Sequence, residues 1–174
     1  MFGIYITGEV PFKHIHLHAR VVDKFGKKMS KSKGNVVNPI EMVDKYGADA
    51  LRFAIIFGAG PGSDIVVSED KIRGMRNFAN KVWNIGRFMV VSCELSVVGR
   101  KDIPFYDEAM YKELKNPEDT LIITELSALV AVVTKNLDTY RFSDAAQTLY
   151  EFIWHRVADV YLEKNKERFK SGDV

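Results

Sequence analysis

The chain has 174 residues, of which 47% are hydrophobic and 28% are charged, and its formal net charge at pH 7 is +2. This length and apolar content allow one large domain or two small ones with a buried core. The nearly balanced charge excludes a histone-like or strongly acidic binder, so any nucleic-acid binding must come from local clusters. The single cysteine, Cys93, excludes an internal disulfide and fits a reducing cytoplasm.

The start of the chain resembles neither a secretory signal nor a membrane anchor. It lacks a basic region ahead of an apolar stretch. We find no apolar run near the ~20 residues that a bilayer span requires. We therefore expect a cytoplasmic protein without a membrane partner. The first residues run directly into a strand-like segment, which favours the interpretation that the chain is a part of something longer.

Short elements are predicted in the first third of the chain. Residues 13–22 alternate in polarity and end in valines, which is typical of a strand. A lysine-rich segment, residues 23–36, follows it. Asn38 and Pro39, with Glu41 three residues after the asparagine, predict the start of a helix. The remaining predictions are a helix that stops at Gly47, a second helix over 48–57 and a glycine-rich turn over 58–63.

Long amphipathic helices are predicted from residue 68 onward. They begin at Ser68, Asn116 and Ser143, where capping residues precede apolar positions at helical spacing. We expect Trp83 and Trp154 to lie in the core of these helices, and the polar tail, 164–174, to fray. The predicted fold is therefore mainly α: an α/β part over 1–67, then a bundle of at least three helices over 68–174.

The lysine-rich segment DKFGKKMSKSKGNV is the strongest chemical signal. It holds five lysines, and Asp23 is the nearby carboxylate with which they could pair. Gly26 and Gly34 give the backbone freedom at both ends. A mobile cationic loop suits a polyphosphate whose charge grows during a reaction. A solvated loop, or a patch that binds phosphate backbones without specificity, has the same composition.

The amino-acid sequence of this segment resembles a known signature motif. Lys28-Met29-Ser30-Lys31-Ser32 is similar to the KMSKS motif of class I aminoacyl-tRNA synthetases, and KGNVVNPIEMVDKYGADALRF continues the likeness. RNFANKVWNIGRF and YRFSDAAQTLYEFIWHRVADVYLE resemble the anticodon-binding helices of the valyl members, as do VPFKHI and GPGSDI. The resemblance implies the last part of a Rossmann-type catalytic domain over 1–67 and an incomplete anticodon-binding bundle over 68–174.

The resemblance also implies roles for the motif. Lys28 and Lys31 would be catalytic, stabilising negative charge on the pyrophosphate that leaves ATP. Met29, Ser30 and Ser32 would join them in binding ATP, which carries Mg²⁺, and His18 would lie near its adenosine end. The implied partners are ATP, an amino acid and tRNA, and the parent enzyme is an aminoacyl-tRNA ligase, most similar to the valyl one.

Several alternatives stay open. The family's HIGH-type motif, amino-acid pocket and editing domain are missing, so we expect this chain alone to be inactive. An isoleucyl or leucyl synthetase fragment, or a stand-alone RNA-binding module without catalysis, is an alternative. One face of the first long helix would contact tRNA or dock onto the catalytic fold; it includes Arg73, Arg76, Asn80 and Arg87. The alternating histidines His14, His16 and His18 could suit zinc, but no carboxylate or cysteine completes a site, so we predict no metal.

Overall fold

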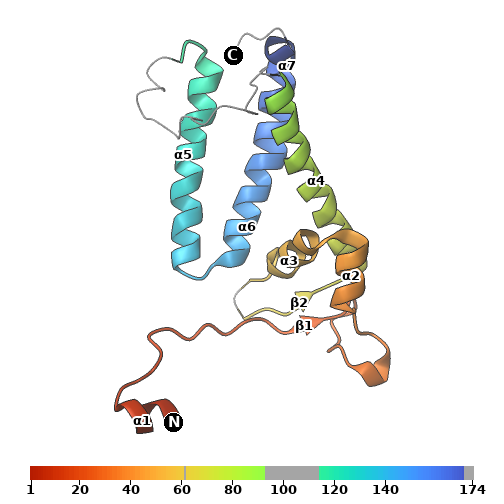
Figure 1. Ribbon diagram of the computed structural model, residues 1–174, viewed down its shortest axis with the longest axis vertical. Helices are drawn as coiled ribbons and strands as arrows, with labels where there is room; N and C mark the ends of the chain where they lie inside the picture. Colours follow the sequence, from red (N-terminus) through yellow and green to blue (C-terminus); the bar gives the residue numbers. More distant parts are fainter. Residues whose placement is uncertain (61, 93–113, 171–174) are drawn as a thin grey trace.

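The computed structural model describes residues 1–60, 62–92 and 114–170. Helices dominate it, and the strands form one small sheet (Figure 1). This confirms the predicted fold class. In chain order the elements are α1 (Phe2–Thr7), β1 (Val21–Val22), the 3-10 turn η1 (Lys31–Lys33), α2 (Pro39–Tyr46), α3 (Ala48–Ile56), β2 (Ile65–Val66), α4 (Glu69–Ser92), α5 (Pro117–Asp138), α6 (Phe142–Glu151), the π-helical segment η3 (Phe152–Leu162) and α7 (Glu163–Lys170).

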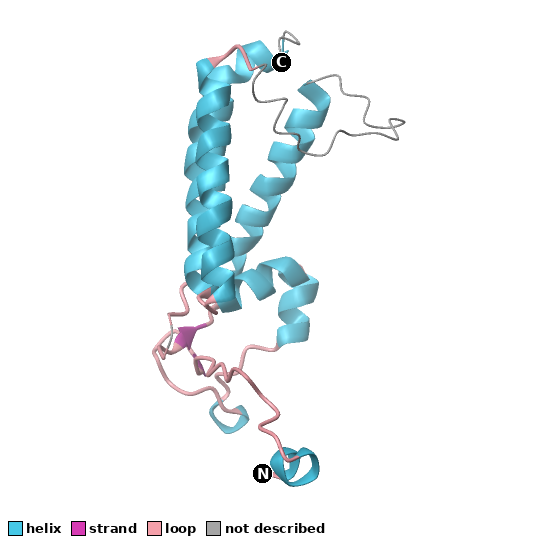
Figure 2. Cartoon of the chain, turned by 90° about the vertical axis from the view of Figure 1, so that its left-hand side faces the viewer, coloured by secondary structure: helices cyan, strands magenta, loops and turns pink. Residues whose placement is uncertain are grey.

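The sheet is smaller than predicted. β1 pairs in parallel with β2, with Val21 opposite Ile65 and Val22 opposite Val66. The prediction of a strand over 13–22 is therefore wrong for all but its last two residues. A strand needs a neighbour with which to exchange hydrogen bonds, and β2 is only two residues long. Figure 2 shows the segment before β1 as an extended loop.

Two predicted helix starts are confirmed by their caps, whereas the start predicted at Ser143 is wrong, because α6 already begins at Phe142. Asn38 Oδ1 accepts a hydrogen bond from the backbone N–H of Ile40 at 3.1 Å, and Asn116 Oδ1 accepts one from that of Glu118 at 2.9 Å. Each asparagine is followed by a proline in the first helical turn. These bonds satisfy amide groups that have no partner within the helix. Local sequence therefore sets where α2 and α5 begin.

The long helices pack on both sides of one central rod. α6, η3 and α7 make one continuous rod, with α5 packed against its α6 and η3 parts and α4 against its η3 and α7 parts (Figure 1). Burial along the rod moves from Ala145 and Ala146 to Ala158, Leu162 and Phe169. The prediction of a fraying tail is wrong for residues 164–170, because α7 packs on α4; residues 171–174 lie outside the described part of the chain.

The main hydrophobic core joins the α/β part to the bundle. Leu51 and Ala54 of α3 pack with Ile72 and Met75 of α4. The ring of Phe78 in α4 then lies 5.2 Å from that of Phe53 in α3 and 4.8 Å from that of Tyr150 in α6, centroid to centroid. Phe53 and Tyr150 pack against the same cluster as the aliphatic side chains, and Phe78 lies beside both rings. The core therefore lies across residue 68 rather than on one side of it.

The two tryptophans differ in their surroundings. Trp154 is half-buried and stacks on Tyr150, with ring centroids 5.6 Å apart and an interplanar angle of 17°. Trp83 is 73% exposed, so the prediction that it belongs to the core is wrong. It borders a groove of about 640 Å³ between α3 and α4, whose floor includes Phe53 and Met75. Cys93 lies outside the described residues.

The helix α5 is unusually apolar on its exposed side. Its length and its mean hydropathy of 1.5 over 18 residues would suffice for a membrane span, so the prediction that no segment reaches this level is wrong. Ile122 and Leu129 are buried against the rod, whereas Val130 is 56% exposed. Glu125 accepts a hydrogen bond from Arg156 of η3. α5 is thus held to the bundle along one side, with apolar residues on the other.

An ion pair closes the far end of the bundle. Asp119 of α5 accepts hydrogen bonds from Arg168 of α7 at 2.6 and 2.8 Å and from the Tyr161 hydroxyl at 2.7 Å. The side chains of Asp119 and Arg168 are 17% and 18% exposed. The Arg168 guanidinium lowers the pKa of Asp119, and burial raises the pKa of Tyr161 to about 12. This cluster fastens α5 to the end of the rod.

Candidate functional site

The lysine-rich segment 23–36 forms a loop directly after β1, and internal hydrogen bonds hold its backbone. Lys28 pairs with Val22 as an isolated antiparallel bridge, so the chain reverses between these residues. Gly26 lies in the reversal with a φ of 73°, and Gly34 near the end of the loop has a φ of 63°. Residues other than glycine rarely adopt such positive φ angles. The two glycines therefore shape the loop through the turns that they permit.

Asp23 and Asn35 join the two ends of this loop. Asp23 Oδ1 accepts hydrogen bonds from the backbone N–H groups of Phe25 and Lys27, both at 2.9 Å. Its other oxygen accepts one from Asn35 Nδ2 at 2.7 Å. These bonds, that from Asn35 first, lower the pKa of Asp23. Sequence reasoning treated Asp23 as a partner for lysines and missed Asn35, because the bond between them spans twelve positions.

The five motif residues are arranged unequally. Met29 packs against the main hydrophobic core, while the Lys28 side chain is exposed to solvent. The hydroxyl oxygens of Ser30 and Ser32 lie 3.3 Å apart. Lys31 opens the 3-10 turn η1, and its side chain lies outside the described part of the structure. The loop thus rests on its methionine and presents Lys28 and Ser32 outward.

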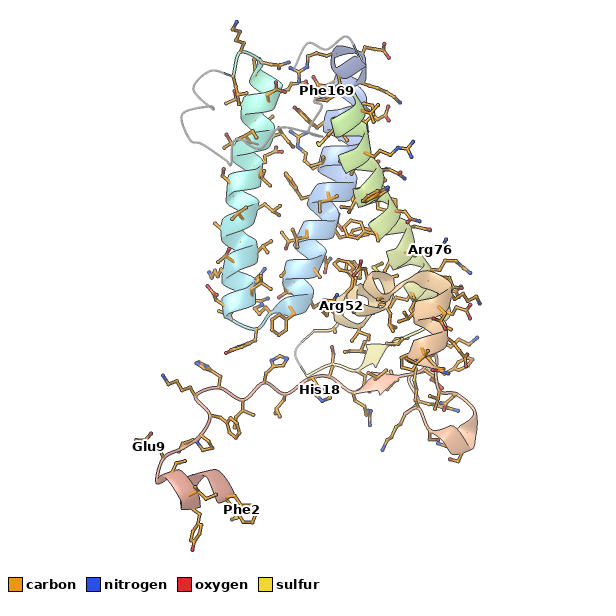
Figure 3. All side chains as sticks on the ribbon, viewed as in Figure 1. Phe2, Glu9, His18, Arg52, Arg76 and Phe169 are labelled. Carbon is orange, nitrogen blue, oxygen red and sulfur yellow. The ribbon has the colours of Figure 1, made fainter. Side chains whose placement is uncertain are left out.

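The histidines lie on the extended segment ahead of β1. His18 Nδ1 lies 2.9 Å from the carbonyl oxygen of Ala19, beside a cavity of about 150 Å³ between this segment, α3 and the start of α6. His18, labelled in Figure 3, precedes β1 in the chain and the loop follows it; among the described residues, no hydrogen bond or ion pair joins His18 to Lys28 or Ser30. The structure therefore does not bring His18 onto the motif.

His14 and His16 face aromatic rings rather than other ligands. Their rings lie 5.6 and 5.9 Å from that of Tyr140, centroid to centroid, and His16 also contacts Phe142 at 5.5 Å. Tyr140 has a φ of 59°, a left-handed conformation, at the turn between α5 and α6. Within residues 1–60, 62–92 and 114–170, no group of three or more histidine, cysteine or acidic side chains could hold a metal ion.

The predicted polar face of the first long helix lies on α4 and is open to solvent. We call it the arginine face; it consists of Arg73, Arg76, Asn80 and Arg87, all of which are exposed. Arg73 forms an ion pair with Asp70 at 2.6 Å. Arg76 points away from the rest of the molecule (Figure 3) and has no ion-pair partner among the described residues, as is also true of Arg87. Two cations of this face are therefore available to an anionic partner.

Two family comparisons match most of the chain. Residues 1–68 match the family of class I tRNA synthetases (I, L, M and V), and residues 119–174 match the anticodon-binding domain of tRNA ligase. A solved ternary complex of a leucyl-tRNA synthetase from Agrobacterium radiobacter shares the fold with a TM-score of 0.68 and 23% identity. It covers 89% of this chain, which covers 18% of that one. The chain belongs to the class I aminoacyl-tRNA synthetases.

Among its curated relatives, the similarity is to the valine-specific members. The valine–tRNA ligase of Pelagibacter ubique is 42% identical over 174 residues, and that of Streptomyces avermitilis is 44% identical over 173 residues. Each alignment covers 99% of this chain and 19% of the relative. The chain thus spans about a fifth of the length of these relatives. The predicted likeness to the valyl enzymes is confirmed.

Proposed function

We propose that this chain supplies two parts of a valine–tRNA ligase: the loop that meets the phosphates of ATP and a helical surface for tRNA. The observation that carries the proposal is the 42% identity to such a ligase over nearly the whole chain. In the proposed reaction, the valine carboxylate attacks the α-phosphate of ATP and pyrophosphate leaves. The aminoacyl group of the resulting adenylate then passes to the 3′ end of tRNA. The proposed location is the cytoplasm.

The charges of the loop support the ATP part of the proposal. Lys28 has no ion-pair partner among the described residues, because the nearby carboxylate of Asp23 is occupied by amide and backbone groups. Lys28 and Lys31 would stabilise negative charge on the departing pyrophosphate, a contribution that raises the rate rather than ground-state affinity. Met29, Ser30 and Ser32 would hold the loop against ATP, and Mg²⁺ would accompany the phosphates. His18 would lie toward the adenosine.

A pyrophosphate-exchange assay tests the role of the motif. In a complete ligase that carries this segment, Lys31→Ala should lower the rate of valine-dependent ATP–pyrophosphate exchange about 100-fold, because it removes a charge aimed at the transition state. The KM for valine should not change. Lys135→Ala, an exposed lysine on α5, is the matched control. An unchanged exchange rate in the Lys31 variant would contradict the assigned role. Exchange catalysed by the 174-residue chain alone would contradict the need for the rest of the enzyme.

The arginine face of α4 supports the tRNA part. Its two unpaired cations, Arg76 and Arg87, suit phosphate oxygens, and contacts of that kind release counterions from the RNA. Replacing both with alanine should weaken tRNA binding and make its dependence on salt shallower by about 2 in the slope of log K against log salt. Arg52→Ala, an exposed arginine on α3 that pairs with Asp49, is the control. An identical salt slope in the double variant would favour docking of this face on protein instead.

The two proposed roles belong to two proposed domains. Residues 1–67 would belong to the catalytic domain and residues 68–174 to the anticodon-binding bundle. The family match to residues 1–68 supports this placement.

A further inference from the structure

We propose that Asn35 and Asp23 form a latch that positions the backbone of Lys28–Ser30 and leaves Lys28 without an ion-pair partner among the described residues. Asn35 is thus a positioning residue, which acts through the groups that it holds and need not touch a substrate. The inference rests on the proposed function only in assigning the phosphates of ATP to this loop. The latch itself is a property of the folded chain.

The side chain of Asn35 holds the loop on both sides of Met29. Its Oδ1 atom accepts a hydrogen bond from the backbone N–H of Ser30 at 3.0 Å. Its Nδ2 atom donates to Asp23 Oδ2 at 2.7 Å and lies 3.4 Å from the carbonyl oxygen of Lys28. One amide group therefore fixes the peptide groups before and after the methionine. A shift of this side chain would displace both motif residues at once.

Asp23 completes the latch, and its carboxylate is hydrogen-bonded to neutral groups although lysines are close in sequence. Its three hydrogen bonds come from Asn35 and from the backbone N–H groups of Phe25 and Lys27. All three donors are neutral groups. They lower the pKa of Asp23, with Asn35 the largest cause and the charge of Lys27 the smallest. The carboxylate is satisfied by dipoles, so the positive charge of the nearby ammonium groups is kept for another anion.

Two other contacts give the latch a fixed base. Met29 packs against the main core, which ties the centre of the loop to α3 and α4. The bridge between Val22 and Lys28 ties the same stretch to β1. With the core below it and Asn35 beside it, the peptide around Met29 is held from two directions. Preorganisation of this kind lowers the cost of placing charges on a transition state.

Exchanging the two side chains provides the test. Asn35→Asp places a second carboxylate beside Asp23 and removes the amide donor. Asp23→Asn removes the charge that the donor meets. The double variant Asp23→Asn with Asn35→Asp restores one amide opposite one carboxylate, with the bond running in the opposite direction. Asp44→Asn, an exposed residue on α2, is the matched control for a lost carboxylate.

The first measurement follows the latch in the 174-residue chain. The backbone amide of Ser30 should exchange its hydrogen about tenfold faster in Asn35→Asp, because its acceptor is pushed away by repulsion. It should return toward the original rate in the double variant and stay unchanged in Asp44→Asn. Amides in α4 report whether the fold is intact. An unaltered Ser30 rate in Asn35→Asp, or no recovery in the double variant, would overturn the latch.

The second measurement follows the consequence in a complete ligase. Asn35→Asp should lower kcat of ATP–pyrophosphate exchange at least about tenfold with the KM for valine unchanged, since misplacement of charges affects the reaction step. The double variant should recover most of this loss. A faster Ser30 amide with an unchanged kcat would overturn the positioning role. If the unmodified ligase showed no valine-dependent exchange, the proposed function would fail while the hydrogen-exchange result still decided the latch.

Discussion

Asp23 in the lysine-rich loop and Asp119 at the far end of the bundle are both carboxylates with a lowered pKa, but their partners differ. Asp119 meets the guanidinium of Arg168, whereas Asp23 meets an asparagine amide and two backbone N–H groups. At the bundle end, opposite charges cancel and hold two helices together. In the loop, the anion is satisfied without cancelling a lysine. An aspartate therefore joins two helices through an ion pair in one region, whereas in the other an aspartate holds the loop through neutral donors.

The largest expected effect of this difference is on stability. Asp119→Ala should lower the free energy of unfolding by about 3 kcal/mol, because it leaves the largely buried Arg168 without its bidentate partner. Asp23→Ala should lower it clearly less, because the partners that lose their acceptor are neutral groups at the edge of an exposed loop. Urea unfolding measures both, with Asp138→Ala on the exposed end of α5 as the control. Equal losses for Asp119→Ala and Asp23→Ala would break the comparison.

A smaller effect is expected on the acid side of the stability curve. The pKa of Asp119 is lowered in the folded protein, first by Arg168, so its contribution is complete above the ordinary carboxyl pKa of about 4. The contribution is lost as the pH falls from there through the lower, folded-state pKa. Asp119→Asn should therefore flatten the loss of thermal stability below about pH 4. A melting curve series from pH 7 to pH 2 that is equally steep in both proteins would count against this ion pair.

Sequence alone predicted the features that depend on neighbouring residues. The starts of α2 and α5 follow from Asn38 and Asn116, whose side chains cap amides two residues further on. The KMSKS-like motif can likewise be recognised from five consecutive residues, 28–32. By contrast, the exposure of Trp83 depends on which helices lie beside α4. Helical periodicity marks the positions of a face without stating what covers it.

Long-range pairing accounts for the other differences. Asn35 meets Asp23 across twelve positions, and no local rule connects an asparagine after Gly34 with a carboxylate before the motif. The helical structure of residues 164–170 likewise depends on a long-range contact. Phe169 is buried, and its ring lies 6.3 Å from that of Phe88 in α4, centroid to centroid. The composition of this tail is polar, so only the tertiary contact reveals it. Sequence thus supplied a hypothesis for the chemistry of the loop, but it did not predict the contacts that support the loop.

The core that crosses residue 68 limits how this molecule can be divided. Met29 of the loop, Leu51 of α3, Ile72 of α4 and Tyr150 of α6 all contribute to one cluster. A cut at the boundary between the two proposed domains would give two pieces, each exposing half of a shared interior. The two parts match different family models but share one hydrophobic core. Any tilt of α4 would therefore shift the core on which Met29 and the lysine-rich loop rest.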